Sequence, residues 1–185
     1  MFENKVDDTM KQFNYTIDKW ISYLDQYTLE MLLQEPQPRS WSIGQVYTHI
    51  ISDTSYFVEQ MKICLATDSN SGMEKHEDAK IIFGKNEFPD MLLVGPSTYS
   101  SVPKPETKEE LLHGLLSIKN EVNRLNAEFS FEKSTGKTER PGFLFFSAIE
   151  WLHFAEIHMR HHLRQKKRID DVLFPGISLQ EKAET

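Results

Sequence analysis

The sequence has almost no cysteine, no long apolar run and no secretion signal. Its 185 residues include a single cysteine, Cys64, so no disulfide can form within the chain. No apolar run approaches the roughly 18 residues that a membrane-spanning helix needs. The first residues also lack the basic start and apolar run of a signal peptide. We therefore expect a cytoplasmic protein that needs neither an oxidising compartment nor a membrane.

The charge balance and the missing motifs exclude several further classes of protein. A formal net charge of −7 argues against a general nucleic-acid-binding protein. The sequence contains no glycine-rich phosphate loop, no Ser-His-Asp order and no His-Glu-x-x-His motif. It therefore gives no support to phosphate-loop, catalytic-triad or zincin chemistry.

The length and the apolar pattern indicate one helical domain. We expect this domain over residues 1–175, followed by a polar tail over residues 176–185. No segment shows the alternation that is typical of a β-strand, whereas four segments repeat apolar residues at steps of three and four. These predicted helices cover residues 3–33, 42–66, 107 to at least 125, and 143–170. We predict an all-α fold, a four-helix bundle.

Capping signals and a long interval place the helices relative to one another. Ser42 and Gln45 have the spacing of a capping box, and Thr107 and Glu110 repeat it, so each pair predicts a helix start. The interval over residues 67–106 has weak periodicity. We expect a long crossover that carries short elements, or a functional flap. The second and third helices therefore need not be antiparallel neighbours.

Two histidines four residues apart suggest a metal site. His158 and His162 would lie on one helix face with Cβ atoms about 5–6 Å apart, which lets one helix offer two ligands to a metal ion. A third histidine, His49, lies on the predicted second helix. If these helices pack side by side, three imidazoles can converge and leave a coordination position open, as in catalytic metal sites. The alternative is that the histidines are structural or solvated, because such spacing also arises by chance.

The other histidines and the cysteine have simpler interpretations. On a helical wheel, His153 and His161 point away from the apolar stripe of the fourth helix, towards the surface. His76 and His113 are also expected at the surface. We expect Cys64 to be a small buried hydrophobe rather than a nucleophile.

Basic residues gather near the end of the fourth helix, namely Arg160, Arg164, Lys166, Lys167 and Arg168. Cations are favoured at a helix C-terminus, which is one explanation. The other is that Arg160 and Arg164 anchor the carboxylates of a substrate.

Two stretches of the sequence resemble the DinB/YfiT superfamily. Residues 38–49 are similar to the Trp-Ser-x-x-x-Val-x-x-His motif at the start of its second helix. Residues 151–165 resemble its closing His-x3-His-Leu-x-Gln signature. The order, the spacing and the four-helix architecture agree over about residues 5–170.

The resemblance implies a bundle with a long crossover and a divalent metal held by His49, His158 and His162. Nickel or zinc is favoured, and manganese or iron is an alternative. Members are frequently homodimers. They include S-transferases that use small thiols such as bacillithiol, mycothiol-dependent isomerases, and proteins described as metal-dependent hydrolases. Many have His-Pro before the fourth helix, where this chain has Arg140-Pro141.

We therefore expect a metal-dependent S-transferase that activates a small thiol to attack an electrophile. Two alternatives stay open. One is a hydrolase that activates water at the metal, and the other is a non-enzymatic metal-binding protein. The fold of this superfamily constrains the site more tightly than it constrains the reaction.

Overall fold

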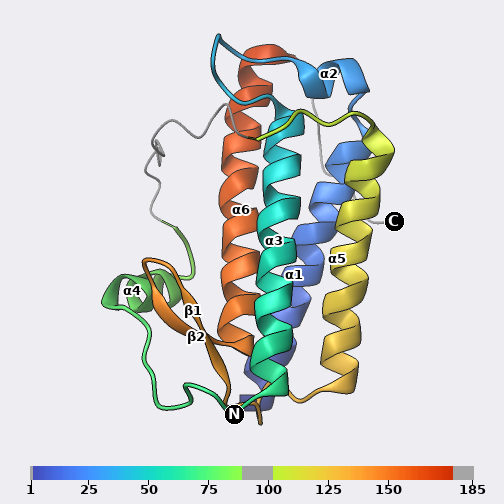
Figure 1. Cartoon of the computed structure of the whole chain (residues 1–185). Coiled ribbons are helices and arrows are strands. Elements are labelled where there is room, and N and C mark those ends of the chain that lie inside the picture. Colours follow the sequence, from blue (N-terminus) through green and yellow to red (C-terminus); the bar gives the residue numbers. More distant parts are fainter. Residues whose placement is uncertain (1, 89–101, 177–185) are drawn as a thin grey trace.

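Within the part of the chain that the structure describes, residues 2–88 and 102–176, four long helices lie side by side (Figure 1). In this computed structural model they are α1 (Phe2–Asp25), α3 (Ile43–Ala66), α5 (Lys108–Glu128) and α6 (Ala148–Leu173). The predicted all-α four-helix bundle is confirmed. The expected polar tail lies almost wholly outside the described residues, so the division into a domain and a tail stays a prediction.

The two central helices of the sequence, α3 and α5, run in the same direction (Figure 1). Near their starts, the Cβ that Gly114 lacks would lie 2.9 Å from Cγ2 of Ile51, so the backbone of α5 approaches α3 closely. Further along both helices, Lys62 pairs with Glu121 at 2.9 Å. Because residue numbers rise together, α3 and α5 are parallel neighbours. The expectation that the crossover releases them from an antiparallel arrangement is confirmed.

The first predicted helix, residues 3–33, is wrong in its length. It divides into α1, which ends at Asp25, and the short α2 (Leu29–Leu33). Thr28 caps α2, since its side-chain oxygen accepts a hydrogen bond from the Met31 N–H at 3.2 Å. The break also buries the ring of Tyr27. Apolar residues keep their helical spacing across this turn, so periodicity alone does not reveal it.

The predicted start of α3 is confirmed, because Ser42 and Gln45 make both hydrogen bonds of a capping box. The start of α5 differs in one detail. Thr107 accepts from the Glu110 N–H at 3.1 Å, but the Glu110 carboxylate accepts from the N–H of Glu106.

The crossover contains a short helix, α4 (Glu77–Lys85), as expected for a segment of this length. Residues 89–101 of the crossover lie outside the described residues. The last residues before this gap lie against α6, because Arg160 donates a hydrogen bond to the carbonyl of Asn86 and Arg164 donates one to the carbonyl of Phe88. The crossover therefore covers one side of the fourth long helix.

A β-hairpin precedes α6, so the prediction that the fourth helix begins after Pro141-Gly142 is wrong. Strand β1 (Lys137–Arg140) pairs antiparallel with β2 (Leu144–Ser147). Gly142 has φ of +82°, a conformation that glycine adopts without strain, and it forms the turn. Strands of four residues are too short to show alternation in a sequence, and Pro-Gly marks a hairpin turn as well as a helix boundary.

Hydrogen bonds between buried side chains and backbone carbonyls join α1, α3 and α6. The indole N–H of Trp20 on α1 donates to the carbonyl of Met159 on α6 at 3.2 Å. The hydroxyl of Tyr47 on α3 donates to the carbonyl of Trp20 at 2.9 Å. Both aromatic rings are fully buried. Among the described residues, no helix is long and apolar enough to cross a bilayer.

Candidate metal centre

Three histidines from two helices meet between α3 and α6. One nitrogen from each of His49, His158 and His162 lies within 4.8 Å of the others. The ring centroids of His49 lie 5.2 Å from His158 and 4.8 Å from His162, and those of His158 and His162 are 4.6 Å apart. The convergence that the sequence analysis required is present.

The two histidines of α6 have the geometry of a ligand pair. Their Nε2 atoms are 3.2 Å apart. Two nitrogens bound at about 2.0–2.1 Å to one tetrahedral zinc ion lie about 3.3 Å apart. The four-residue spacing of His158 and His162 therefore sets a nitrogen separation that suits a single divalent ion.

Gln165 determines which ring nitrogen of His162 has an available lone pair. The Nδ1 of His162 lies 2.7 Å from Oε1 of Gln165. An amide oxygen only accepts hydrogen bonds, so Nδ1 carries the proton and the lone pair is on Nε2, which faces the cluster. Metal-binding histidines commonly have such a partner on the far nitrogen. The donor set and its tautomer therefore fit a divalent metal.

Asp53 adds a negative charge beside two of the histidines. Its Oδ1 lies 3.6 Å from Nδ1 of His49, and its Oδ2 lies 3.7 Å from Nε2 of His158. The Asp53 side chain is 35% exposed, so this side of the cluster is open to solvent. The sequence analysis missed Asp53, although its spacing of four residues from His49 was a usable signal. The negative charge of a carboxylate at this position stabilises a bound cation.

Aromatic rings form the other walls of the cluster. Trp41 packs on His49 with ring centroids 5.0 Å apart, and Phe57 and Phe88 lie 5.6 and 6.4 Å from His158. The Nδ1 of His158 is buried and has no hydrogen-bond partner among the described residues. Ring packing and the 3.2 Å contact of its Nε2 with Nε2 of His162 therefore hold the orientation of His158.

Burial keeps these imidazoles neutral near pH 7. It lowers the pKa of His162 to about 3, with the nearby His49 as the next cause. Burial also holds the pKa of His158 well below its usual value, and His162 and His49 add to this effect. The pKa of His49 is lowered by burial and is raised in part by Asp53. Neutral imidazoles have the lone pairs that a metal needs.

Acid is therefore expected to destabilise the metal-free protein through these histidines. A histidine whose pKa is lower in the folded state binds fewer protons there than in the unfolded chain. Stability thus falls as the pH drops below about 6.5, by up to about 1.4 kcal/mol per pH unit for His162. Urea unfolding with a chelator present, between about pH 7 and pH 5, measures this slope. His162→Gln should flatten it, and equal slopes for the variant and the unchanged protein would contradict the assignment.

Comparison with protein families places the chain in a known group. A family model described as the DinB superfamily matches residues 12–165. The chain belongs to the DinB superfamily. No curated protein and no solved structure gives a match. The matched residues include the three histidines, so membership of the DinB superfamily and the observed cluster both fit a metal-binding protein.

In this DinB superfamily member, the two arginines predicted to bind substrate are held by the protein itself. Arg160 donates from Nε and Nη2 to the two carboxylate oxygens of Glu156, at 2.9 Å each, and to the Asn86 carbonyl at 2.7 Å. Arg164 donates to the Phe88 carbonyl at 2.9 Å. Their role as substrate anchors stays a prediction, and it would require these contacts to be exchanged for substrate.

His161 is buried, so its predicted place at the surface is wrong. Its side chain is 9% exposed, its ring centroid lies 5.6 Å from that of Phe88, and its Nδ1 lies 3.0 Å from Nη2 of Arg164. A helical wheel assigns this face to solvent because it does not include the crossover. In the DinB fold of this chain, the residues that follow α4 cover it.

The remaining predictions on single residues are mostly confirmed. His76 and His113 are exposed, and Cys64 is completely buried. Burial raises the pKa of the Cys64 thiol, so the thiolate needed for a nucleophile is disfavoured. His153 is half-buried rather than solvated, because its Nε2 lies 2.7 Å from Oδ1 of Asn86.

Proposed function

We propose that this protein is a divalent-metal-dependent S-transferase that activates a low-molecular-weight thiol of the bacillithiol type. One observation carries the proposal, namely the three converging imidazoles with the free Nε2 of His162 set by Gln165. His49, His158 and His162 would hold the metal. Nickel or zinc suits this all-imidazole donor set best, with manganese and iron as alternatives.

The metal would lower the pKa of a thiol that occupies the open position and so supply thiolate at neutral pH. The residues of the chain would prepare the site for this chemistry. Asp53 lies on the solvent-exposed side and adds negative charge, which favours cation binding. The rings of Trp41, Phe57 and Phe88 exclude water from the other sides, and a soft sulfur is compatible with such apolar walls.

In the proposed reaction the thiolate sulfur attacks an electrophilic carbon of the co-substrate. The new S–C bond forms as the bond to the leaving group breaks, and the leaving group departs with that electron pair. The thiol proton is released to solvent. The reaction is a substitution without net oxidation or reduction, so it needs no further redox partner.

The test is turnover of chlorodinitrobenzene by nickel- or zinc-loaded protein, with bacillithiol and then cysteine as thiols. We expect chloride release and thioether formation to depend on both thiol and metal. We expect His158→Ala to lose this activity, whereas His113→Ala, which changes an exposed histidine on α5, should keep it.

Two other outcomes would overturn this proposal. Hydrolysis of p-nitrophenyl acetate by metal-loaded protein without any thiol would favour the hydrolase alternative. Metal-loaded protein that turns over neither substrate would favour a metal-binding protein without catalytic function.

We also propose that the protein is a cytoplasmic homodimer that binds no nucleic acid. Light scattering in solution tests the dimer directly.

A further inference from the structure

Arg140, at the end of β1, lies among three phenylalanine rings. Its guanidinium carbon is 5.9 Å from the ring centroid of Phe57, 6.0 Å from that of Phe143 and 5.5 Å from that of Phe154. The hairpin turn therefore positions a cation against the aromatic side of α3 and α6. Such rings attract a cation, but they offer no oxygen atom that could accept a hydrogen bond from its N–H groups.

The N–H groups of Arg140 are poorly satisfied. Its Nε is buried and has no hydrogen-bond partner among the described residues. Nη1 donates to the Pro141 carbonyl at 3.3 Å, and Arg140 forms no ion pair with any residue of the described part of the chain. Arg160, by contrast, donates to both carboxylate oxygens of Glu156. A guanidinium offers up to five donors, so Arg140 has unused capacity for an anion.

One aromatic ring, that of Phe57, lies close to both Arg140 and the histidine cluster. Its centroid is 5.9 Å from the guanidinium carbon of Arg140 and 5.6 Å from the ring centroid of His158. Asp53, on the solvent side of His49 and His158, has the opposite charge. An anionic group would thus be repelled at Asp53 and attracted at Arg140.

We propose that Arg140 binds a carboxylate of the thiol substrate and so orients its sulfur towards His49, His158 and His162. This inference rests on the proposed function and adds the residue that recognises the carboxylate of the thiol. The planar guanidinium matches a carboxylate, with which it forms charge-assisted hydrogen bonds. Arg140 acts as a positioning residue with no role as a metal ligand.

The first experiment compares two thiols that differ in one charge. N-acetylcysteine and N-acetylcysteine amide are titrated into nickel-loaded protein, and the sulfur-to-nickel absorption band reports binding. We expect the acid to bind about tenfold more tightly than the amide, the usual scale of a hydrogen bond to a charged group. Arg140→Gln should abolish this preference and Arg140→Lys should keep part of it, while the nickel content stays unchanged.

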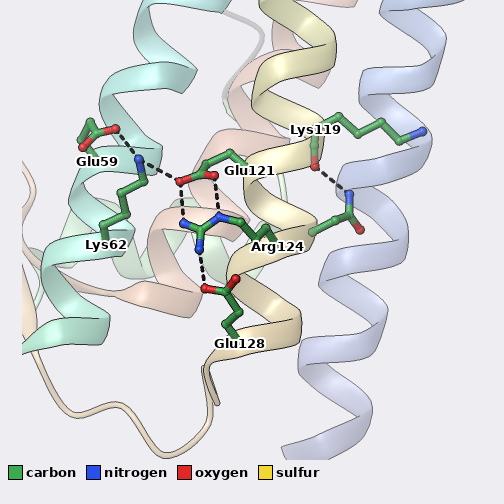
Figure 2. A network of polar contacts seen from close by, with 7 residues as sticks. Glu59, Lys62, Lys119, Glu121, Arg124 and Glu128 are labelled. Atoms are coloured by element: carbon green, nitrogen blue, oxygen red, sulfur yellow. Dashed lines mark hydrogen bonds and ion pairs between the residues drawn. The ribbon is translucent and has the colours of Figure 1, made fainter.

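The control is Arg124→Gln, which removes the same charge from an exposed position on α5, where Arg124 pairs with Glu121 and Glu128 (Figure 2). It should keep the preference for the acid. Equal binding of the two thiols by the unchanged protein would overturn the inference. So would a preference that survives in Arg140→Gln.

A second experiment separates this inference from the proposed metal chemistry. Acetate is titrated into metal-free protein, and the Arg140 Nε–Hε signal is followed by NMR, with Arg140→Lys used to assign it. A saturable shift of that signal supports an anion site at Arg140 even if no nickel binds. A signal that does not respond to acetate would overturn the inference, whatever the metal content.

Discussion

Arg160→Met is expected to destabilise the protein by about 3 kcal/mol, because it leaves a buried carboxylate without its counter-charge. The Glu156 side chain is 2% exposed and accepts hydrogen bonds from Arg160 and from the Thr16 hydroxyl at 2.9 Å. Buried pairs lose about 3–5 kcal/mol when one partner is removed. Because the Arg160 side chain is 37% exposed, we take the lower end of that range.

Urea unfolding of three variants measures this effect. Arg124→Met is the matched control, since Arg124 pairs with Glu121 and Glu128 in an exposed network on α5 (Figure 2). We expect the control substitution to lower the free energy of unfolding by no more than about 1 kcal/mol. Arg160→Met with Glu156→Gln should cost less than Arg160→Met alone, because no buried charge is left unpaired. Similar losses for Arg160→Met and Arg124→Met would refute a strong buried pair.

His162→Ala is expected to weaken nickel or zinc binding by more than about 100-fold. Changes to residues that only orient a ligand typically cost 10–100-fold in metal affinity, and His162 would be a ligand itself. Gln165→Ala, which removes the hydrogen-bond partner of His162 Nδ1, should fall within that smaller range.

Competition with a chromophoric chelator measures both affinities. His113→Ala is the control, because His113 is exposed on α5, which contributes no residue to the cluster. The unfolding free energy of each metal-free variant shows whether the loss arises from the site or from the fold. A His162→Ala variant that binds metal as tightly as His113→Ala would remove His162 from the ligand set.

The sequence was sufficient to predict four long helices, although not the end of α1 or the start of α6, and to single out the three histidines that lie together in the structure. The apolar residues of these helices recur every three or four positions over more than twenty residues. The capping residues Ser42 and Thr107 mark the starts of two helices. His158 and His162 border the apolar stripe of α6, so their spacing alone brings their rings together. His49 was first considered because it lies on the predicted second helix, and the resemblance to a family motif then supported it as a ligand, since a single histidine on a helix has no periodic signal.

The features that the sequence did not reveal depend on contacts between distant segments. Phe88, from the crossover, covers His161, which a helical wheel assigns to solvent. Arg140 is one residue before a Pro-Gly turn, and only the hairpin brings it to Phe57 on α3. Long-range packing of this kind has no local periodicity, so neither wheel nor spacing predicts it.

X-ray absorption at the metal edge of untagged, zinc-loaded protein tests the central claim most directly. We predict one zinc ion per chain with three imidazole nitrogens at about 2.0–2.1 Å and one water oxygen in the open position. The same spectrum of His158→Ala should show no stoichiometric zinc. Protein that retains no zinc, or a zinc shell without imidazole, would contradict a three-histidine metal centre in this bundle.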